Sequence, residues 1–241
     1  MVNQIEETFI QNLLTFDISL SDLQLNQFRD YYNLLIEWNQ KMNLTAITEY
    51  PEVLTKHFLD SLSIAKELKE KKDIQLIDIG TGAGFPGIPI KIVYPDISIT
   101  LLDSLQKRIT FLEEVISQLR FSKKETIHGR AEDFAKQKEY REKYDICVSR
   151  AVANLSTLSE LCIPFVKVGG TFISYKSEKA DLEIKEAQKA VSLFGGDIIK
   201  KESFILPGTD YERNLLITKK IKETPSKYPR KAGTPAKQPI K

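Results

Sequence analysis

The sequence contains little cysteine, little histidine and no long apolar run. Its 241 residues include two cysteines and two histidines. The cysteines, Cys147 and Cys162, lie inside apolar segments without a CxxC spacing, which favours buried free thiols over a disulfide framework or a metal site. No stretch approaches the roughly 18 consecutive apolar residues of a membrane-spanning helix, and the acidic start MVNQIEETF is unlike a secretory signal. We therefore expect a cytoplasmic protein that does not enter a membrane and binds no metal.

Charge of one sign is absent from one end of the chain. The formal net charge is only +2, but residues 224–241 (TPSKYPRKAGTPAKQPIK) hold five of the 35 basic residues and none of the 33 acidic ones. This asymmetry suits a chain that meets a polyanion through one limited surface, although a solvated end explains the charge equally well. The four prolines of this tail argue against a helix and favour an extended strap.

The spacing of apolar residues divides the remainder into two parts. Residues 1–72 are expected to form a helical subdomain, because a capping box at Ser21 and Gln24 precedes apolar residues at helical spacing. A second amphipathic helix is expected over residues 52–70. In residues 73–223 the apolar residues have a different spacing, and this part is expected to form the main domain.

In the main domain, short β-branched runs alternate with amphipathic segments, which is typical of parallel βαβ units. The last two runs, DIIKKESFIL and RNLLITKKI, are separated only by PGTDYE, a loop too short for a crossover helix, so these strands pair antiparallel. The prediction is an α/β fold with a seven-stranded, mostly parallel sheet, an antiparallel terminal hairpin and an N-terminal helical cap.

A glycine-rich turn follows the first strand, in the stretch LIDIGTGAGFPGIP. It fits G-x-G-x-x-G, the dinucleotide fingerprint, and also G-x-G-x-G, the methyltransferase one. Asp78 precedes the first glycine, so its carboxylate is expected to lie close to the ligand, where it repels a pyrophosphate and suits the cations of S-adenosylmethionine. Two prolines after the turn cannot donate N–H groups to a pyrophosphate. We therefore favour an S-adenosylmethionine site that includes Asp78, Gly80, Gly82 and Gly84 over a nicotinamide site.

Acidic residues also follow the next two strands. Asp103 ends ITLLD, where a carboxylate accepts hydrogen bonds from ribose hydroxyls in either kind of site. Glu132 and Asp133 follow the third strand in GRAED. They are placed to recognise the adenine edge, but an ordinary acidic first turn of a helix explains them as well.

The motifs DIGTGAGFPGIPIKI, LLDS followed by KR, GRAED, VSRAVA and TPSKYPRKAGTPAKQP occur in this order. NLTAIT and KHFLDSL precede them. With these motifs the chain resembles, over nearly its whole length, the bacterial small-subunit ribosomal RNA methyltransferase family called RsmG or glucose-inhibited division protein B. The resemblance implies a Rossmann-like class I S-adenosylmethionine-dependent methyltransferase that methylates N7 of one guanine in 16S ribosomal RNA. It also implies that the cofactor pocket is lined by Gly80, Phe85, Ala131, Glu132 and Arg150.

Methylation of guanine N7 requires few catalytic groups from the protein. The N7 lone pair is exposed on the Hoogsteen edge, and its attack on a methyl group loses no proton, so no general base is needed. His57 and Asp60, expected one helical turn apart, form either an acid–base pair or a structurally held histidine. Arg150 binds the cofactor, a base or a phosphate. No residue is assigned as catalytic.

RNA contact is expected from the tail, where an aromatic side chain lies among cations. The residues are Lys227, Tyr228, Arg230 and Lys231. Deletion of the chain after Glu223 is expected to weaken RNA binding and to leave cofactor affinity intact. We expect a monomer whose partner is 16S rRNA or the small ribosomal subunit. The alternatives are a methyltransferase for a protein or small molecule and a non-catalytic RNA-binding factor.

Overall fold

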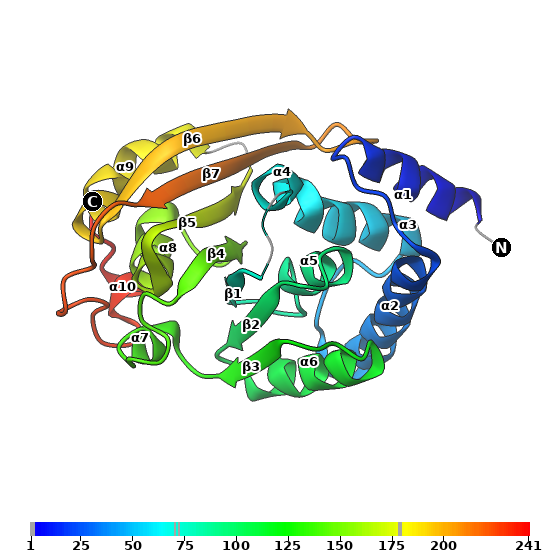
Figure 1. Cartoon of the computed structure of the whole chain (residues 1–241), viewed down its shortest axis with the longest axis horizontal. Coiled ribbons are helices and arrows are strands. Elements are labelled where there is room, and N and C mark those ends of the chain that lie inside the picture. The colour runs from blue at the N-terminus through cyan, green and yellow to red at the C-terminus, as the bar shows by residue number, and fades with distance from the viewer. Residues whose placement is uncertain (1–2, 70, 72, 178–179) are drawn as a thin grey trace.

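The computed structural model describes residues 3–69, 71, 73–177 and 180–241. These residues form a seven-stranded sheet with the order β3-β2-β1-β4-β5-β7-β6 (Figure 1). The strands are β1 (Gln75–Ile79), β2 (Ser98–Asp103), β3 (Lys124–His128), β4 (Tyr144–Arg150), β5 (Val166–Lys176), β6 (Gly196–Ile205) and β7 (Glu212–Lys220). Strands β1 to β5 pair in parallel, and β7 pairs antiparallel with both β5 and β6. The predicted α/β fold with an antiparallel terminal hairpin is confirmed.

Helices cover both faces of the sheet, which explains why its central strands are apolar on both sides. On one face lie α1 (Gln4–Leu14), α2 (Asp22–Met42), α3 (Tyr50–Val53), the turns η1 (Leu54–Leu59) and η2 (Leu62–Ile64), α4 (Ala65–Leu68), α5 (Gly87–Val93) and α6 (Gln106–Gln118). On the other lie α7 (Ala131–Phe134), α8 (Leu155–Cys162), η3 (Ile163–Phe165), α9 (Ala180–Leu193) and α10 (Thr234–Lys237). In the described part of the chain, no helix has the length and apolar character needed to cross a membrane.

Helix α2 joins the N-terminal helices to the sheet. The predicted capping box at its start is present, since Ser21 and Gln24 exchange side-chain and backbone hydrogen bonds. The Gln24 amide also donates to the carbonyls of Ile92 and Val93 at the end of α5 (2.9 and 3.1 Å). The rings of Tyr31 and Phe58 stack with centroids 5.2 Å apart, both fully buried. Burial of each such side chain stabilises the fold by roughly 1.5–3 kcal/mol.

The prediction of a single helix over residues 52–70 is wrong. The segment is divided into α3, the π-helical turn η1, the 3₁₀ turn η2 and α4. Two serines bond back to the chain, with Ser61 Oγ donating to the His57 carbonyl and Ser63 Oγ to that of Asp60. Such bonds compete with a regular helix. Every residue from Phe58 to Ala65 is buried, so tertiary packing on all sides overrides the amphipathic pattern.

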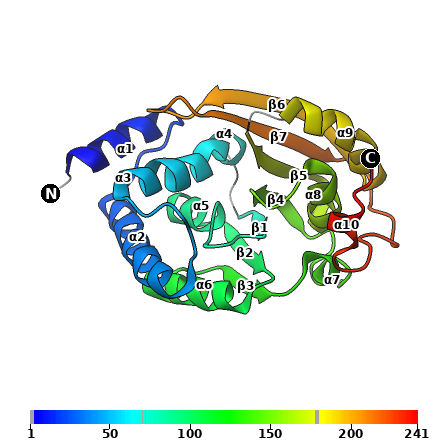
Figure 2. The same ribbon diagram turned by 180° about the vertical axis from the view of Figure 1, so that it is seen from behind.

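The C-terminal tail lies against α7 and α8, as the view from behind shows (Figure 2). The Arg141 guanidinium donates to the carbonyls of Thr224 and Tyr228 (2.6 and 2.9 Å). The Tyr228 ring packs edge-on against Phe194, with centroids 5.1 Å apart. The expectation that prolines exclude a helix from the tail is wrong, because Pro235 lies in the first turn of α10, where no N–H is required.

Candidate functional site

A cavity of about 390 Å³ opens at the carboxyl ends of β1, β2 and β4. Strand order reverses between β1 and β4, and ligands of open parallel sheets bind at such a point. The cavity is lined by seven of the residues predicted for cofactor binding: Gly80, Gly82, Phe85, Asp103, Ala131, Glu132 and Arg150. Asp78 and Gly84 are not among its lining residues.

The glycine turn forms one wall of this cavity. Gly80 and Gly82 have φ values of +70° and +63°, which L side chains rarely adopt. A Cβ at Gly82 meets no atom within 4 Å, so the backbone there faces open space. Gly84 serves packing instead, because a Cβ there lies 2.5 Å from Ile88 and 2.8 Å from the Tyr31 hydroxyl. The Tyr31 hydroxyl in turn donates to the Ala83 carbonyl (2.5 Å).

Asp78 does not lie at the cavity, contrary to the expectation from sequence. Side chains alternate along β1, and this one points to the α5 face with Leu76, away from Ile77. Its Oδ2 accepts hydrogen bonds from the Gly87 N–H (2.9 Å) and the Thr81 hydroxyl (2.7 Å). Complete burial raises the pKa of Asp78 to about 7. The carboxyl group therefore anchors the start of α5 and occupies an N–H that a pyrophosphate would need.

Asp103 is fixed at the end of β2 by backbone donors. Its Oδ2 accepts from the Gly82 N–H and its Oδ1 from the Leu105 N–H, both at 2.9 Å. Arg108 of α6 adds an ion pair at 3.1 Å. Sequence reasoning assigned no role to Arg108, although the motif LLDS followed by KR contains it. The turn and the acidic group are thus held in one rigid unit at the cavity wall.

Glu132 links the cavity to the tail. It lies in the first turn of α7, and its Oε1 accepts a hydrogen bond from the Gly233 N–H (2.8 Å). Only 6% of Glu132 is exposed. A residue of the cavity wall is therefore positioned by a segment about 100 residues further along the chain, which no local pattern reveals.

His57 and Phe85 form the wall contributed jointly by the N-terminal region and the glycine turn. Their rings stack with centroids 4.5 Å apart, and the Arg150 guanidinium lies 5.2 Å from the Phe85 ring. His57 Nε2 is 2.8 Å from the Thr45 hydroxyl. Burial and the charge of Arg150 lower the pKa of His57 to about 4, so the imidazole is neutral at neutral pH.

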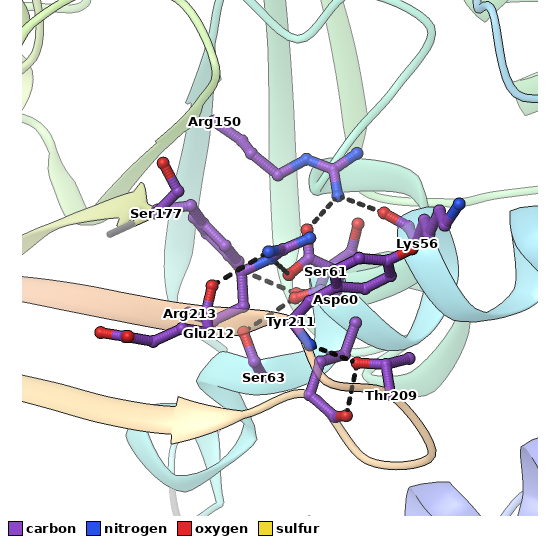
Figure 3. Close-up of polar contacts among 12 residues, drawn as sticks. Lys56, Asp60, Ser61, Ser63, Arg150, Ser177, Thr209, Tyr211, Glu212 and Arg213 are labelled. Atoms are coloured by element: carbon purple, nitrogen blue, oxygen red, sulfur yellow. Dashed lines mark hydrogen bonds and ion pairs between the residues drawn. The ribbon is translucent and has the colours of Figure 1, made fainter. Parts of the chain in front are cut away.

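The hydrogen-bond partners of the Asp60 carboxylate are two arginines rather than His57. Its Oδ2 accepts from Arg150 (2.7 Å) and its Oδ1 from Arg213 (2.9 Å), as Figure 3 shows. Both oxygens are thus engaged by cations, and the structure supports the alternative of a held histidine. Leu44, Thr45 and His57 line the cavity; the sequence suggests His57 only as a possible acid–base partner of Asp60 and gives Leu44 and Thr45 no place in the site. The motifs NLTAIT and KHFLDSL were the available signal.

The residues around this cavity fit S-adenosylmethionine. The cavity volume lies within the roughly 300–1,000 Å³ range of small-molecule sites. Gly82 leaves room for close approach of a ligand, and Asp103 and Glu132 place acidic groups at the ends of neighbouring elements. The fold and this site define a class I S-adenosylmethionine-dependent methyltransferase. A solved structure described as a SAM-dependent methyltransferase from Aquifex aeolicus shares the fold, with a TM-score of 0.50 and 15% identity over 70% of this chain and 93% of that one.

Sequence comparison gives the family. Residues 24–206 match the GidB family, described as rRNA small subunit methyltransferase G. A ribosomal RNA small subunit methyltransferase G from Lachnoclostridium phytofermentans is 55% identical, covering 97% of this chain and 96% of the relative. A protein of the same name from Desulforamulus reducens is 52% identical, covering 99% and 100%. The chain belongs to this family, and its cofactor is S-adenosylmethionine.

Proposed function

We propose that this protein transfers the methyl group of S-adenosylmethionine to N7 of one guanine in the 16S rRNA of the small ribosomal subunit. Family membership supports rRNA as the substrate, because the relatives are named for it. One observation at the site supports N7 as the acceptor atom. The two candidate bases near the cavity are already engaged, His57 by Thr45 and Asp60 by two arginines. A site in which neither of these two groups is a free base suits an acceptor that loses no proton.

The chain's own residues then act by positioning. When bound, the cofactor supplies an electrophilic methyl group. Asp103 is placed to accept hydrogen bonds from ribose hydroxyls, and Glu132, in the first turn of α7 after the neighbouring strand β3, is placed to recognise an adenine edge. Phe85, in contact with both His57 and Arg150, covers one side of the cavity. Holding two reactants in line accounts for much of the rate in such a transfer.

The tail residues are proposed to contribute to RNA binding in two different ways, by direct contact and by holding the tail. Lys227 and Lys231 are exposed, so phosphates can reach them; the Lys227 Nζ lies 5.3 Å from the Tyr228 ring centroid. Tyr228 is half-buried against Phe194, and Arg230 is engaged by the buried Glu160. Tyr228 and Arg230 therefore hold the tail so that the two lysines face outward.

The test is transfer of a labelled methyl group from S-adenosylmethionine to assembled small subunits and to naked 16S rRNA. We expect incorporation into RNA in at least one of these forms. Label in ribosomal protein supports the alternative of a protein methyltransferase. Binding of either RNA form with no transfer supports a non-catalytic RNA-binding factor.

We further propose that the protein works as a monomer in the cytoplasm, where ribosomal subunits are found. Among the described residues, large apolar side chains that are exposed, such as Leu23, Leu182 and Ile199, come from different elements. Sedimentation at micromolar concentration tests this, with one species of 27.5 kDa expected. A dimer at that concentration would contradict it.

A further inference from the structure

A second, larger cavity of about 580 Å³ adjoins the cofactor cavity. The two share a wall made by His57 and by Arg150 with the two residues that follow it, Ala151 and Val152. The second cavity continues from this wall to the ends of β5 and β7, where Tyr175 and Arg213 line it. A molecule bound there lies next to one bound in the cofactor cavity.

The charged residues of the second cavity leave a positive balance. Asp60 is neutralised by Arg150 and Arg213. Glu183 is 2.7 Å from Lys176, so that acid is also paired. Lys56 lines the cavity as well, and its Nζ pairs with Glu52, which is not among the lining residues. Four cations face two acids within the cavity, which suits an anionic occupant.

Tyr211 stands beside these cations on the loop between β6 and β7. Its ring lies 5.4 Å from Lys56 Nζ and 5.6 Å from the Arg213 guanidinium, and 43% of the residue is exposed (Figure 3). The loop is held in shape: the Tyr211 N–H donates to the Thr209 hydroxyl (3.0 Å), and the Leu206 N–H donates to the Tyr211 carbonyl (2.9 Å). The backbone that carries this exposed ring is therefore held in place by hydrogen bonds within the loop.

An aromatic ring flanked by cations is the arrangement with which proteins hold single-stranded nucleic acid, since bases stack on the ring and phosphates meet the cations. We propose that the second cavity and Tyr211 form the acceptor site for RNA. The target guanosine, turned out of its stack, occupies the cavity with N7 toward the shared wall. A neighbouring base stacks on Tyr211, and the linking phosphate contacts Lys56 and Arg213. The inference rests on the proposed function and adds to it a position for the acceptor strand.

The test compares Tyr211→Ala with Tyr211→Phe, which keeps the ring. Ile205→Ala is the control, because Ile205 lies at the end of β6 beside the same loop and is 56% exposed. We expect Tyr211→Ala to raise the KM for the RNA substrate roughly 10-fold, since removal of a stacking platform has effects of this order. Tyr211→Phe and Ile205→Ala remain within about twofold of the wild type, and cofactor affinity is unchanged in all three.

Two further measurements use the complex with S-adenosylhomocysteine, which needs no turnover. Lys56→Gln is expected to reduce the slope of the logarithm of the RNA-binding constant against the logarithm of salt concentration by about one. RNA carrying 4-thiouridine is expected to crosslink to the peptide that contains Tyr211. Crosslinks that form only to other peptides of the protein, or a KM for Tyr211→Ala equal to that of the wild type, overturn the acceptor site. Failure of the wild type to methylate any RNA overturns the proposed function, whereas the crosslink tests the acceptor site by itself.

Discussion

Replacement of Arg230 by alanine tests whether the tail is part of the folded body. The Arg230 guanidinium donates to both oxygens of Glu160 (2.6–3.0 Å), and the Arg230 N–H donates to Oε1 at 2.7 Å. The side chain of Glu160 is 1% exposed and that of Arg230 is 25% exposed. Removal of one partner of a buried ion pair costs about 3–5 kcal/mol. Because Arg230 is partly exposed and the backbone N–H remains, we expect about 3 kcal/mol.

For a domain of this size, such a loss lowers the melting temperature by roughly 6–12 °C. Lys231→Ala is the matched control, because Lys231 is the adjacent cation and is exposed; its cost should stay within about 0.5 kcal/mol. In a Glu160→Gln background, Arg230→Ala should cost only about 1 kcal/mol, since no charge is left unpaired. Guanidinium denaturation measures the wild type and all four variants, including Glu160→Gln alone. The reasoning fails if Arg230→Ala resembles Lys231→Ala, or if its cost is the same in both backgrounds.

Three further predictions concern the cofactor cavity and its support. Burial raises the pKa of Asp78 to about 7, so the folded protein holds its proton where the unfolded chain has lost it, and stability falls as pH rises from about 4 to 7. Between pH 5 and 8, the free energy of unfolding measured with denaturant should fall by about 3 kcal/mol less in Asp78→Asn than in the wild type. Equal falls in the two proteins would contradict this prediction. Phe85→Leu removes the ring that stacks on a neighbouring imidazole and should weaken S-adenosylmethionine binding roughly 3- to 10-fold by calorimetry, whereas unchanged affinity would exclude Phe85 from the wall. Gly84→Ala places a Cβ 2.5 Å from a side chain and should destabilise the protein by more than about 2 kcal/mol. The control Gly169→Ala should cost about 1 kcal/mol, because Gly169 has a positive φ but open space around it. Equal melting temperatures of the two variants would refute the packing role of Gly84.

Much of the fold follows from the sequence because the signals are local. The alternation of β-branched runs with amphipathic segments predicts the parallel strands, and the short loop PGTDYE predicts the pairing of β6 with β7. The glycine turn and Asp103 reach the cavity because they end their strands there. The prediction for residues 52–70 fails because tertiary contacts, rather than a local pattern, determine the structure of this segment, which is buried on every side.

Parts of the site were beyond sequence reasoning because they depend on side-chain direction or distant partners. Asp78 has the position in sequence expected of a ligand-facing acid, but the alternation along β1 turns it to the α5 face. Glu160 and Arg230 are 70 residues apart, so the tail's charge was interpreted as free for RNA.

The contacts of the tail also change one expectation. Gly233 donates to Glu132 at the cavity wall, so deletion after Glu223 is expected to weaken cofactor binding as well as RNA binding. Calorimetry of the truncated protein with S-adenosylmethionine measures this, and affinity equal to that of the full chain would restore the sequence-based expectation.

The most direct test of the central claim identifies the atom that is methylated. 16S rRNA recovered after incubation with the protein and S-adenosylmethionine is treated with borohydride and aniline, which cleave the chain at N7-methylguanosine. We predict cleavage at one guanine that depends on both protein and cofactor. Methyl label that resists this cleavage, because it lies on an exocyclic amine, a ribose or a pyrimidine ring, would contradict the account.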